Sequence, residues 1–488
     1  MLEAISILLA WLLGFLLIQA LDPVGSIEPR WAAVLFKAAL GTGVGMGVAS
    51  IIFLLLDVTG AASPAAILGI DIGLVAVLAW HWFRTRSNPG APSSSDVRAP
   101  GFRWTWLLAL AFGAVLVISL ARLVQMAIAL PVGEWDAWTL WNLRAKFLAG
   151  PGDSWRYALS PLLYGTHPDY PLLLSAFVAR VWEAGGGVNE IAPVVTAFAF
   201  FAALLALLVS AVALLRGAAS ALLAGLVILS TTSLLLWTPA QYADIPLAFF
   251  YLGAVALIFL GESARGHAQF WAGLCAGLAA WTKNEGVAFL ICILIVFLTL
   301  TLWQRRTRAA IIRAGWLLAG ASPGVLLTLW LKFWLAPPVN PLSGLSHLYD
   351  ASRYVQVAEG FFKNLLNLGS GVSHPLILLA ILGILLRWKV EERYKWPLLI
   401  STTSLVLVFL TYCGELVMTP WSLDWQLQTS LDRLILQVWP SFLLLFFVAL
   451  RNVADVAIPS APVKNTVTRK SPAVSGKRAL AGRKLKGV

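Results

Sequence analysis

Acidic and aromatic side chains gather in one short segment that directly follows an apolar run. Residues 133–146 read GEWDAWTLWNLRAK and hold Glu134 and Asp136 among three tryptophans. An aromatic belt at a membrane surface explains the tryptophans, but not two carboxylates between apolar neighbours. A carboxylate there can act as a general base toward a hydroxyl group. We take Asp136, ahead of Glu134, as the candidate catalytic residue, and Trp138 and Trp141 as candidate binding residues.

A proline-rich turn supplies a second group of polar side chains. Residues 166–174 read THPDYPLLL, and the prolines fix the chain on both sides of Asp169 and Tyr170. The segment is therefore either a rigid turn before an apolar helix or part of a site. We add His167, Asp169 and Tyr170 to the candidate binding residues, and leave open whether His167 binds a metal or a phosphate.

A third group lies where the motif PAQYADIP leads into an apolar run. Asp244 begins that run and Gln241 precedes it. A carboxylate at the start of a helix is also favoured by the helix dipole, so capping is the alternative interpretation. We include both residues among the candidates.

Two basic residues stand at positions where a partner or an anion is expected. The motif WTKNEG sets Lys283 and Glu285 between two almost contiguous apolar runs. A lysine there either extends to the membrane surface without function or binds a phosphate as a point charge. Arg433 opens the last apolar run against the positive-inside trend. It therefore needs a partner, either a nearby aspartate (Asp424 or Asp432) or an anionic ligand.

The composition places these segments in a membrane protein. The 488 residues are 59% hydrophobic and 12% charged, against about 25% charged in soluble chains. A helical span needs about 20 apolar residues, and only helices satisfy a lipid-embedded backbone without closing a barrel. We expect an all-α polytopic fold with about 13 transmembrane helices. The apolar runs are 4–21, 33–56, 64–83, 104–130, 190–214, 218–237, 244–261, 268–283, 286–303, 310–335, 374–388, 397–413 and 433–450.

Lysine and arginine recur in alternate loops between the apolar runs, which predicts the orientation of these loops. These residues are Arg84, Arg86, Arg98, Arg103, Arg216, Arg265, Arg305, Arg306, Arg308, Arg313, Arg387, Lys389, Arg393 and Lys395. All fall on the cytoplasmic side if residues 171–186, which contain Arg180 and Glu183, form an interfacial helix within an outer loop. The N-terminus is then outside and the C-terminus cytoplasmic. All the candidate site residues then share the outer face.

Composition and the order of the apolar runs divide the chain into four parts. We expect an N-terminal three-helix segment (1–86), a cytoplasmic linker (87–103), a membrane module (104–450) and a disordered basic tail (451–488). The tail holds nine lysines and arginines against one acid, but no aromatic residues are interleaved, which argues against nucleic acid as a partner. The three cysteines lack metal-ligand spacing. Asp71 lies inside an apolar run and is a functional candidate by default, without an assigned role.

Residues 104–450 resemble the GT-C fold glycosyltransferases, and in particular are similar to bacterial relatives of protein O-mannosyltransferases and of the aminoarabinose lipid A transferase. The resemblance rests on Asp136 in the first outer loop, the proline-rich stretch 166–172, Asp-x-Pro-Leu at 244–247, Lys-x-Glu-Gly at 283–286 and the late Arg433. Such families often have two adjacent acids in the first loop, whereas here Trp135 separates Glu134 from Asp136.

The resemblance implies a plasma (inner) membrane enzyme that takes a sugar from a polyprenyl-phosphate carrier and gives it to a glycan, lipid or protein acceptor, with membrane lipid around it. It implies no certain cofactor, because some members of the class bind a divalent metal ion and others do not, and we assign no metal ligand. A lipid-linked glycan flippase or transporter, and a glycan ligase or polymerase, are the alternatives. A transporter would need charges near the bilayer midplane in paired halves, which the sequence does not show.

Overall fold

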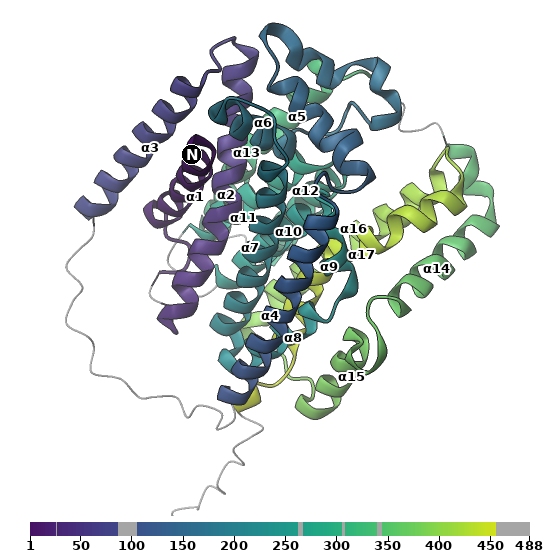
Figure 1. The fold of residues 1–488 in the computed structure, drawn as a ribbon. Helices are drawn as coiled ribbons and strands as arrows, with labels where there is room; N and C mark the ends of the chain where they lie inside the picture. Colours follow the sequence, from purple (N-terminus) through teal and green to yellow (C-terminus); the bar gives the residue numbers. More distant parts are fainter. Residues whose placement is uncertain (26, 86–104, 262–266, 305–307, 339–343, 455–488) are drawn as a thin grey trace, which may run out of the picture.

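The structure is a computed structural model that describes residues 1–25, 27–85, 105–261, 267–304, 308–338 and 344–454. This described chain is helical almost throughout, and its one β-type contact is a bridge between Trp388 and Leu450. The expected all-α class is confirmed (Figure 1). The helices are α1 (Leu2–Ala20), α2 (Arg30–Val58), α3 (Pro64–Thr85), α4 (Thr105–Ala129), η1 (Ala137–Trp141), α5 (Asn142–Leu148), η2 (Gly152–Leu159), η3 (Pro161–Thr166), α6 (Leu173–Gly185), α7 (Ile191–Arg216), α8 (Ala218–Leu229), α9 (Thr232–Trp237), α10 (Asp244–Leu260), α11 (Ala268–Thr282), α12 (Asn284–Gln304), α13 (Arg308–Trp330), η4 (Leu331–Leu335), η5 (Leu345–Tyr349), α14 (Ala351–Leu366), η6 (Gly371–Ser373), α15 (Pro375–Leu386), η7 (Glu392–Tyr394), α16 (Lys395–Met418) and α17 (Leu423–Ala449).

Nine helices in the described part of the chain are long and apolar enough to cross a membrane, namely α1, α2, α3, α4, α7, α12, α13, α16 and α17. The protein is therefore a multi-pass membrane protein. Four other expected spans fold as shorter helices: α8, α10, α11 and α15. At about 1.5 Å per residue, even the 17-residue α10 is shorter than a hydrocarbon core about 30 Å thick. The expected total of thirteen spans is not confirmed.

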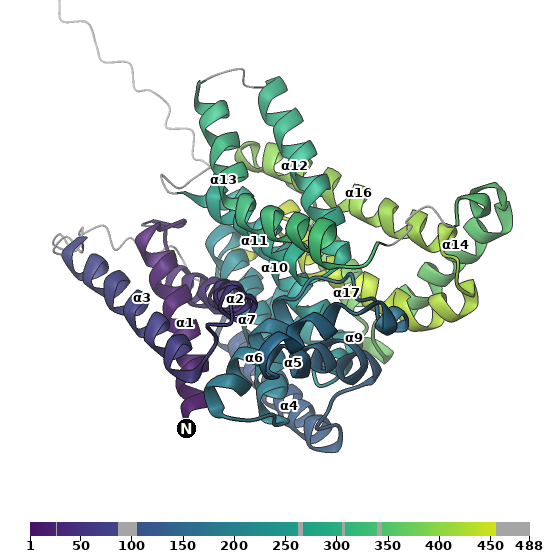
Figure 2. The same ribbon diagram turned by 90° about the horizontal axis from the view of Figure 1, so that it is seen from above.

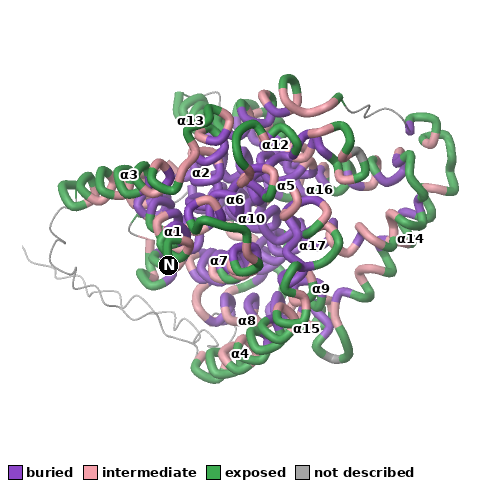
Figure 3. The backbone as a smooth tube through the Cα atoms, turned by 45° about the horizontal axis from the view of Figure 1, so that its top comes forward, coloured by how far each residue is buried: buried purple, intermediate pink, exposed green. Residues whose placement is uncertain are grey.

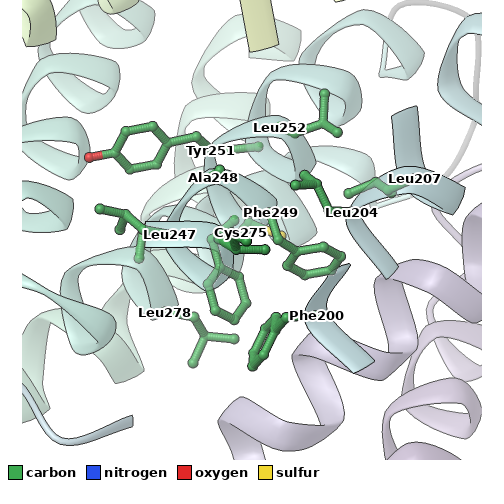
Figure 4. Packing of buried hydrophobic residues seen from close by; sticks show 14 of the residues in the cluster. Phe200, Leu204, Leu207, Leu247, Ala248, Phe249, Tyr251, Leu252, Cys275 and Leu278 are labelled. Carbon is green, nitrogen blue, oxygen red and sulfur yellow. The ribbon is translucent and has the colours of Figure 1, made fainter. Parts of the chain in front are cut away.

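Helix α10 forms the centre of the bundle. All of its residues are buried, and Figure 4 shows its Phe249 among side chains of α7 and α11. The Phe200 ring of α7 meets Phe249 edge-on at 5.8 Å between ring centroids. Figure 3 shows the opposite pattern on α3, α4 and α14, whose residues are largely exposed or partly exposed at the periphery. The central helix is therefore enclosed by protein, while α3 and α4 present apolar side chains to lipid.

Glycines bring α11 and α13 into unusually close contact. Gly273 and Gly277 of α11 face Gly320 and Gly324 of α13, both pairs at small-xxx-small spacing. A Cβ at Gly273 would lie 2.0 Å from the Leu317 carbonyl oxygen, and one at Gly320 would lie 1.8 Å from that of Phe270. No side chain fits at these positions, so the two backbones touch and the helices form one rigid unit.

Helix α6 does not lie on the surface as residues 171–186 were expected to. Its 13 residues are too few to cross, in agreement with the expectation, but almost all are buried against α1, α2, α3 and α5. Arg180 explains the difference: it forms a buried ion pair with Asp71 of α3 and donates to Ser6 Oγ of α1 at 2.8 Å. The intramembrane Asp71 thus has a partner that its sequence neighbourhood does not reveal.

Two other segments differ from expectation. Residues 336–373 fall between the expected spans 310–335 and 374–388, yet they contain the amphipathic helix α14, which lies on the opposite flank from α1 and α3 (Figure 2). The last span was expected from residue 433, but α17 begins ten residues earlier, at Leu423. The expected linker 87–103 and most of the expected tail lie outside the described residues.

The basic loop residues meet at one end of the bundle, which we call the basic end. Arg216 at the end of α7 pairs with Glu391 and donates to the Val448 carbonyl of α17. The backbone of Arg451 donates to the carbonyl of Arg387 at 3.0 Å. Figure 1 shows this end at the bottom, near the start of α4, and shows α5 and α6 at the other end. We call the second one the polar end.

Candidate active site

Asp244, the first residue of α10, is a fully buried charge at the polar end. Its Oδ1 accepts hydrogen bonds from Lys283 Nζ at 3.0 Å and from Gln437 Nε2 at 2.6 Å. Its Oδ2 lies 3.9 Å from Arg433 Nη1. The carboxylate therefore holds side chains of other segments together rather than capping its own helix.

Lys283 occupies the single-residue break between α11 and α12. Its backbone is extended, and a Cβ at the following Gly286 would lie 1.9 Å from the Ala279 carbonyl oxygen, so only glycine fits this close approach. Lys283 Nζ also contacts Glu285 Oε1 at 2.7 Å. Burial lowers the pKa of Lys283, but Asp244 and Glu285 outweigh it, and the net shift is upward. The ammonium thus stays charged between two carboxylates.

Arg433 of α17 links this buried pair to the first loop. Its Nη1 forms an ion pair with Asp136 Oδ2, and its Nε donates to the Thr429 carbonyl at 2.9 Å. The guanidinium carbon lies 5.7 Å from the ring centre of Trp237 and 5.1 Å from that of Tyr242. Arg433 therefore has the partner that its position demanded, but this partner is Asp136.

The neighbouring aspartate, Asp432, has a different role from the one considered. Its Oδ2 accepts from Trp237 Nε1 at 2.6 Å, and its Oδ1 accepts from the backbone of Arg433 at 2.8 Å. Trp237 stacks on Tyr242 with 5.0 Å between ring centroids. Burial raises the pKa of Tyr242 to about 12, so its hydroxyl is neutral and accepts the backbone N–H of Asp136 at 3.2 Å. These contacts fix both members of the Asp136–Arg433 pair.

A second ion pair lies beside the first. Asp169 Oδ2 accepts from Lys332 Nζ at 2.6 Å and from Asn284 Nδ2 at 2.8 Å, and Lys332 donates to Asn284 Oδ1 at 2.8 Å. Burial raises the pKa of Asp169, but Lys332 and the Asn284 amide more than offset this and bring it below its ordinary value. Because Asn284 stands between Lys283 and Glu285 in sequence, the two clusters share the α11–α12 break.

The loop that carries Asp169 is held from below by Arg144 of α5. Arg144 donates to the carbonyls of Thr166 at 2.7 Å and Tyr170 at 3.3 Å, and also to that of His167. The His167 ring stacks on Tyr170 at 4.8 Å. Its side chain has exposed surface but is surrounded by protein on most sides, and the resulting desolvation lowers the pKa of His167. The imidazole is therefore neutral at pH 7.

Hydrogen bonds extend the network into the apolar helices. Tyr412 Oη donates to Gln437 Oε1 at 2.6 Å and lies 3.1 Å from Tyr251 Oη, which donates to the Glu285 carbonyl at 2.7 Å. Tyr251, Tyr412 and Gln437 were not predicted, nor were the roles of Asn284 and Lys332. A usable signal existed for Gln437 and Lys332, because polar side chains inside apolar runs are costly unless they have partners.

Of the predicted residues, the structure joins five in one continuous chain of contacts: Asp136, Arg433, Asp244, Lys283 and Glu285. Asp169 forms the adjoining pair, and His167 and Tyr170 stack beside it. Tyr170 also stacks on the buried Trp141 at 5.9 Å.

The other three predicted residues lie outside the chain of contacts. Glu134 and Trp138 are exposed. Gln241 binds the first loop, donating to the Pro131 carbonyl and accepting from Asn142 Nδ2, each at 3.0 Å.

Exposure is graded along the chain of contacts. The exposed fraction of the side chain is 23% for Asp136, 12% for Arg433 and 1% for Asp244. A molecule approaching from the polar end would therefore meet Asp136 first, and the Asp244–Lys283 pair lies beneath it. This order suits Asp136 to contact a reacting group and Asp244 to hold the cations in place.

The carboxylates of this site are matched by cations rather than grouped as a metal site. Among the described residues, no three His, Cys, Asp or Glu side chains are placed to hold a metal ion. Asp136, Asp244 and Asp169 each contact an arginine or a lysine instead. This donor set does not fit a divalent ion, and we derive no step through one.

No family model, no curated protein and no solved structure matches this chain.

Proposed function

We propose that this protein is a membrane glycosyltransferase that moves a sugar from a polyprenyl-phosphate-linked donor to an acceptor hydroxyl at the polar end. The observation that carries the proposal is the continuous chain of contacts from Asp136 through Arg433, Asp244 and Lys283 to Glu285. It lies at the ends of membrane helices, the depth to which a lipid carrier delivers its head group.

The ion pair of Asp136 and Arg433 supplies the reactive groups. A guanidinium binds phosphate in two-pronged fashion, so the donor phosphate can take over Arg433 and release Asp136 Oδ2. Asp136 then accepts the proton of the acceptor hydroxyl. The oxygen of that hydroxyl attacks the anomeric carbon of the sugar from the side opposite the phosphate. The bond from that carbon to the phosphate oxygen breaks, and the phosphate leaves with the electron pair. The sugar is thus transferred with inversion.

The remaining cations would stabilise the leaving phosphate. Lys283 is held charged beneath Arg433 by Asp244 and Glu285. Lys332 is more accessible, with 29% of its side chain exposed, against 7% for Lys283. A phosphate bound beside Arg433 would therefore be stabilised by the charge of Lys283 beneath it. Lys332 would lie at the side of the same phosphate.

The basic end supports an orientation for the proposal. Arg216, Arg387 and Arg451 meet there, and short basic loops remain cytoplasmic. We therefore place the polar end outside a plasma membrane, with the N-terminus outside and the C-terminus in the cytoplasm. Sugar transfer would then occur on the outer side.

The proposal is tested by sugar transfer in membranes from cells that lack the protein. Purified protein is added with a panel of donors, each a radiolabelled sugar on polyprenyl phosphate, and label is followed from the lipid fraction into acceptor material. The Asp136→Asn variant should lose about 10²-fold or more in rate. Asp153→Asn is the matched control, because Asp153 lies in the same loop but is largely exposed.

Two results would contradict the proposal. Asp136→Asn with near-normal transfer and normal folding would remove the assigned base. Label that crosses the membrane without joining an acceptor would favour a flippase instead.

A further inference from the structure

An apolar groove lies between α15 and α17, away from the candidate active site. Its volume is about 610 Å³, within the range of small-molecule sites. The α15 wall consists of residues three and four apart, which share one helix face. The lining residues are Leu376, Leu379, Ala380, Gly383, Ile384, Arg387 and Trp388, with Phe442 and Phe446 of α17. Eight of these nine side chains are uncharged, so the groove suits a hydrocarbon chain.

A cluster of exposed cations stands at the mouth of this groove, at the basic end. The segments 387–389 and 449–451 pair through the Trp388–Leu450 bridge and a hydrogen bond from Lys389 N to the Ala449 carbonyl at 2.8 Å. This pairing ties the end of α15 to the end of α17. It brings Arg387, Lys389 and Arg451 together, and all three are exposed.

These three cations differ from the basic residues around them. Arg216, Arg393 and Lys395 each pair with a glutamate, whereas no ion pair joins Arg387, Lys389 or Arg451 to the described residues. An apolar groove that ends at three uncompensated positive charges has the chemistry of an anionic phospholipid: an acyl chain and a phosphate.

We infer that this groove is a binding site for one anionic phospholipid of the leaflet at the basic end. One acyl chain lies along Gly383 between Leu379 and Phe446, and the phosphate binds Arg387 with Lys389 and Arg451 near it. The site is independent of the proposed transfer reaction, because it lies at the other end of the bundle and shares no residue with it.

Gly383 offers a direct way to fill the groove. A Cβ there would meet Phe446 Cζ and Trp388 Cζ2 at 3.8 Å each, which is ordinary contact, so a side chain enters without displacing backbone. Gly383→Leu should therefore occupy the space of the acyl chain. Gly315→Leu is the matched control, because a Cβ at Gly315 of α13 meets nothing within 4 Å.

The test is native mass spectrometry of the full chain, with phosphatidylglycerol and phosphatidylcholine of identical acyl chains as probes. Wild type should retain phosphatidylglycerol in preference to phosphatidylcholine. Arg387→Gln should lower that preference about fivefold, as expected for one cation near an anionic head group. Gly383→Leu should abolish the retained lipid, while Gly315→Leu and Lys395→Gln should behave as wild type.

Two results would overturn the inference. Retention of phosphatidylglycerol that survives both Gly383→Leu and Arg387→Gln would place the lipid elsewhere. An equal loss of preference in Arg387→Gln and Lys395→Gln would show diffuse attraction by the basic end rather than a site.

Discussion

Removing the charge of Lys283 should destabilise the protein through Glu285 more than through Asp244. Lys283 is 7% exposed and contacts both carboxylates. Asp244 keeps Gln437 at 2.6 Å and Arg433 at 3.9 Å when the lysine is gone. Glu285 keeps no side-chain partner among the described residues, and its Oε2 already has none. Breaking a buried pair by removing one partner costs about 3–5 kcal/mol, and we expect that loss for Lys283→Met.

The prediction is tested by thermal unfolding in detergent. The measured quantity is the fraction of protein that stays monodisperse on heating. For a chain of this length, 1 kcal/mol corresponds to about 1 °C in the midpoint, so Lys283→Met should lower it by about 3–5 °C. Adding Glu285→Gln should restore most of the loss, whereas adding Asp244→Asn should restore less. If the two double variants recover equally, or if Lys283→Met unfolds like the exposed control Asp153→Asn, the assignment of Glu285 as the dependent charge is refuted.

Three further variants test other contacts. Arg180→Met leaves Asp71 buried without its cation and should cost about 3–5 kcal/mol of stability, whereas the double variant Asp71→Leu/Arg180→Met should regain most of it. Thermal unfolding measures the difference. A single variant as stable as the double one would contradict the pairing. Gly286→Ala places a Cβ 1.9 Å from the Ala279 carbonyl oxygen and should reduce the yield of monodisperse protein, whereas Gly315→Ala should not; equal yields would be inconsistent with the close approach. Lys332 and Asn284 hold the pKa of Asp169 below its ordinary value, so the contribution of Asp169 to stability is fully present above that ordinary value and is lost as the pH falls through the lowered pKa. Lys332→Met should flatten this acid dependence in midpoints recorded as the pH is lowered from about 5 to about 2, and an unchanged slope would remove Lys332 as its cause.

The meeting of Asp136, Asp244, Lys283, Glu285 and Arg433 could be predicted because each stands beside an apolar run, and charge placement assigned those positions to one face. A shared face limits the separation of charged side chains in a compact bundle. Which of them pair could not be predicted, since pairing depends on how α17 packs against the first loop. Asp432 is adjacent to Arg433 in sequence, yet its side chain points to Trp237 instead.

The parts of the fold that could not be predicted depend on long-range contacts or on a different periodicity. From the sequence, the charge of Arg180 disfavoured a buried position for α6. Its counter-charge is Asp71, which lies 109 residues earlier in the chain. Helix α14 has no continuous apolar run, because Arg353, Glu359 and Lys363 separate its apolar residues along the sequence. The segment therefore lacks the long apolar run of a membrane span, although its apolar residues follow the 3.6-residue period of an amphipathic helix.

The contact between α11 and α13 has a consequence for how the lysines are spaced. Lys283 follows the last residue of α11, and Lys332 lies two residues beyond α13. Because Gly273 and Gly320 place backbone directly against backbone, neither helix can slide along the other without a collision of main-chain atoms. The separation of the two ammonium groups is thus set by four glycines, Gly273, Gly277, Gly320 and Gly324. Gly273 lies about 15 Å along the helix from Lys283. A single methyl group added there would shift the register of the two charges without touching either.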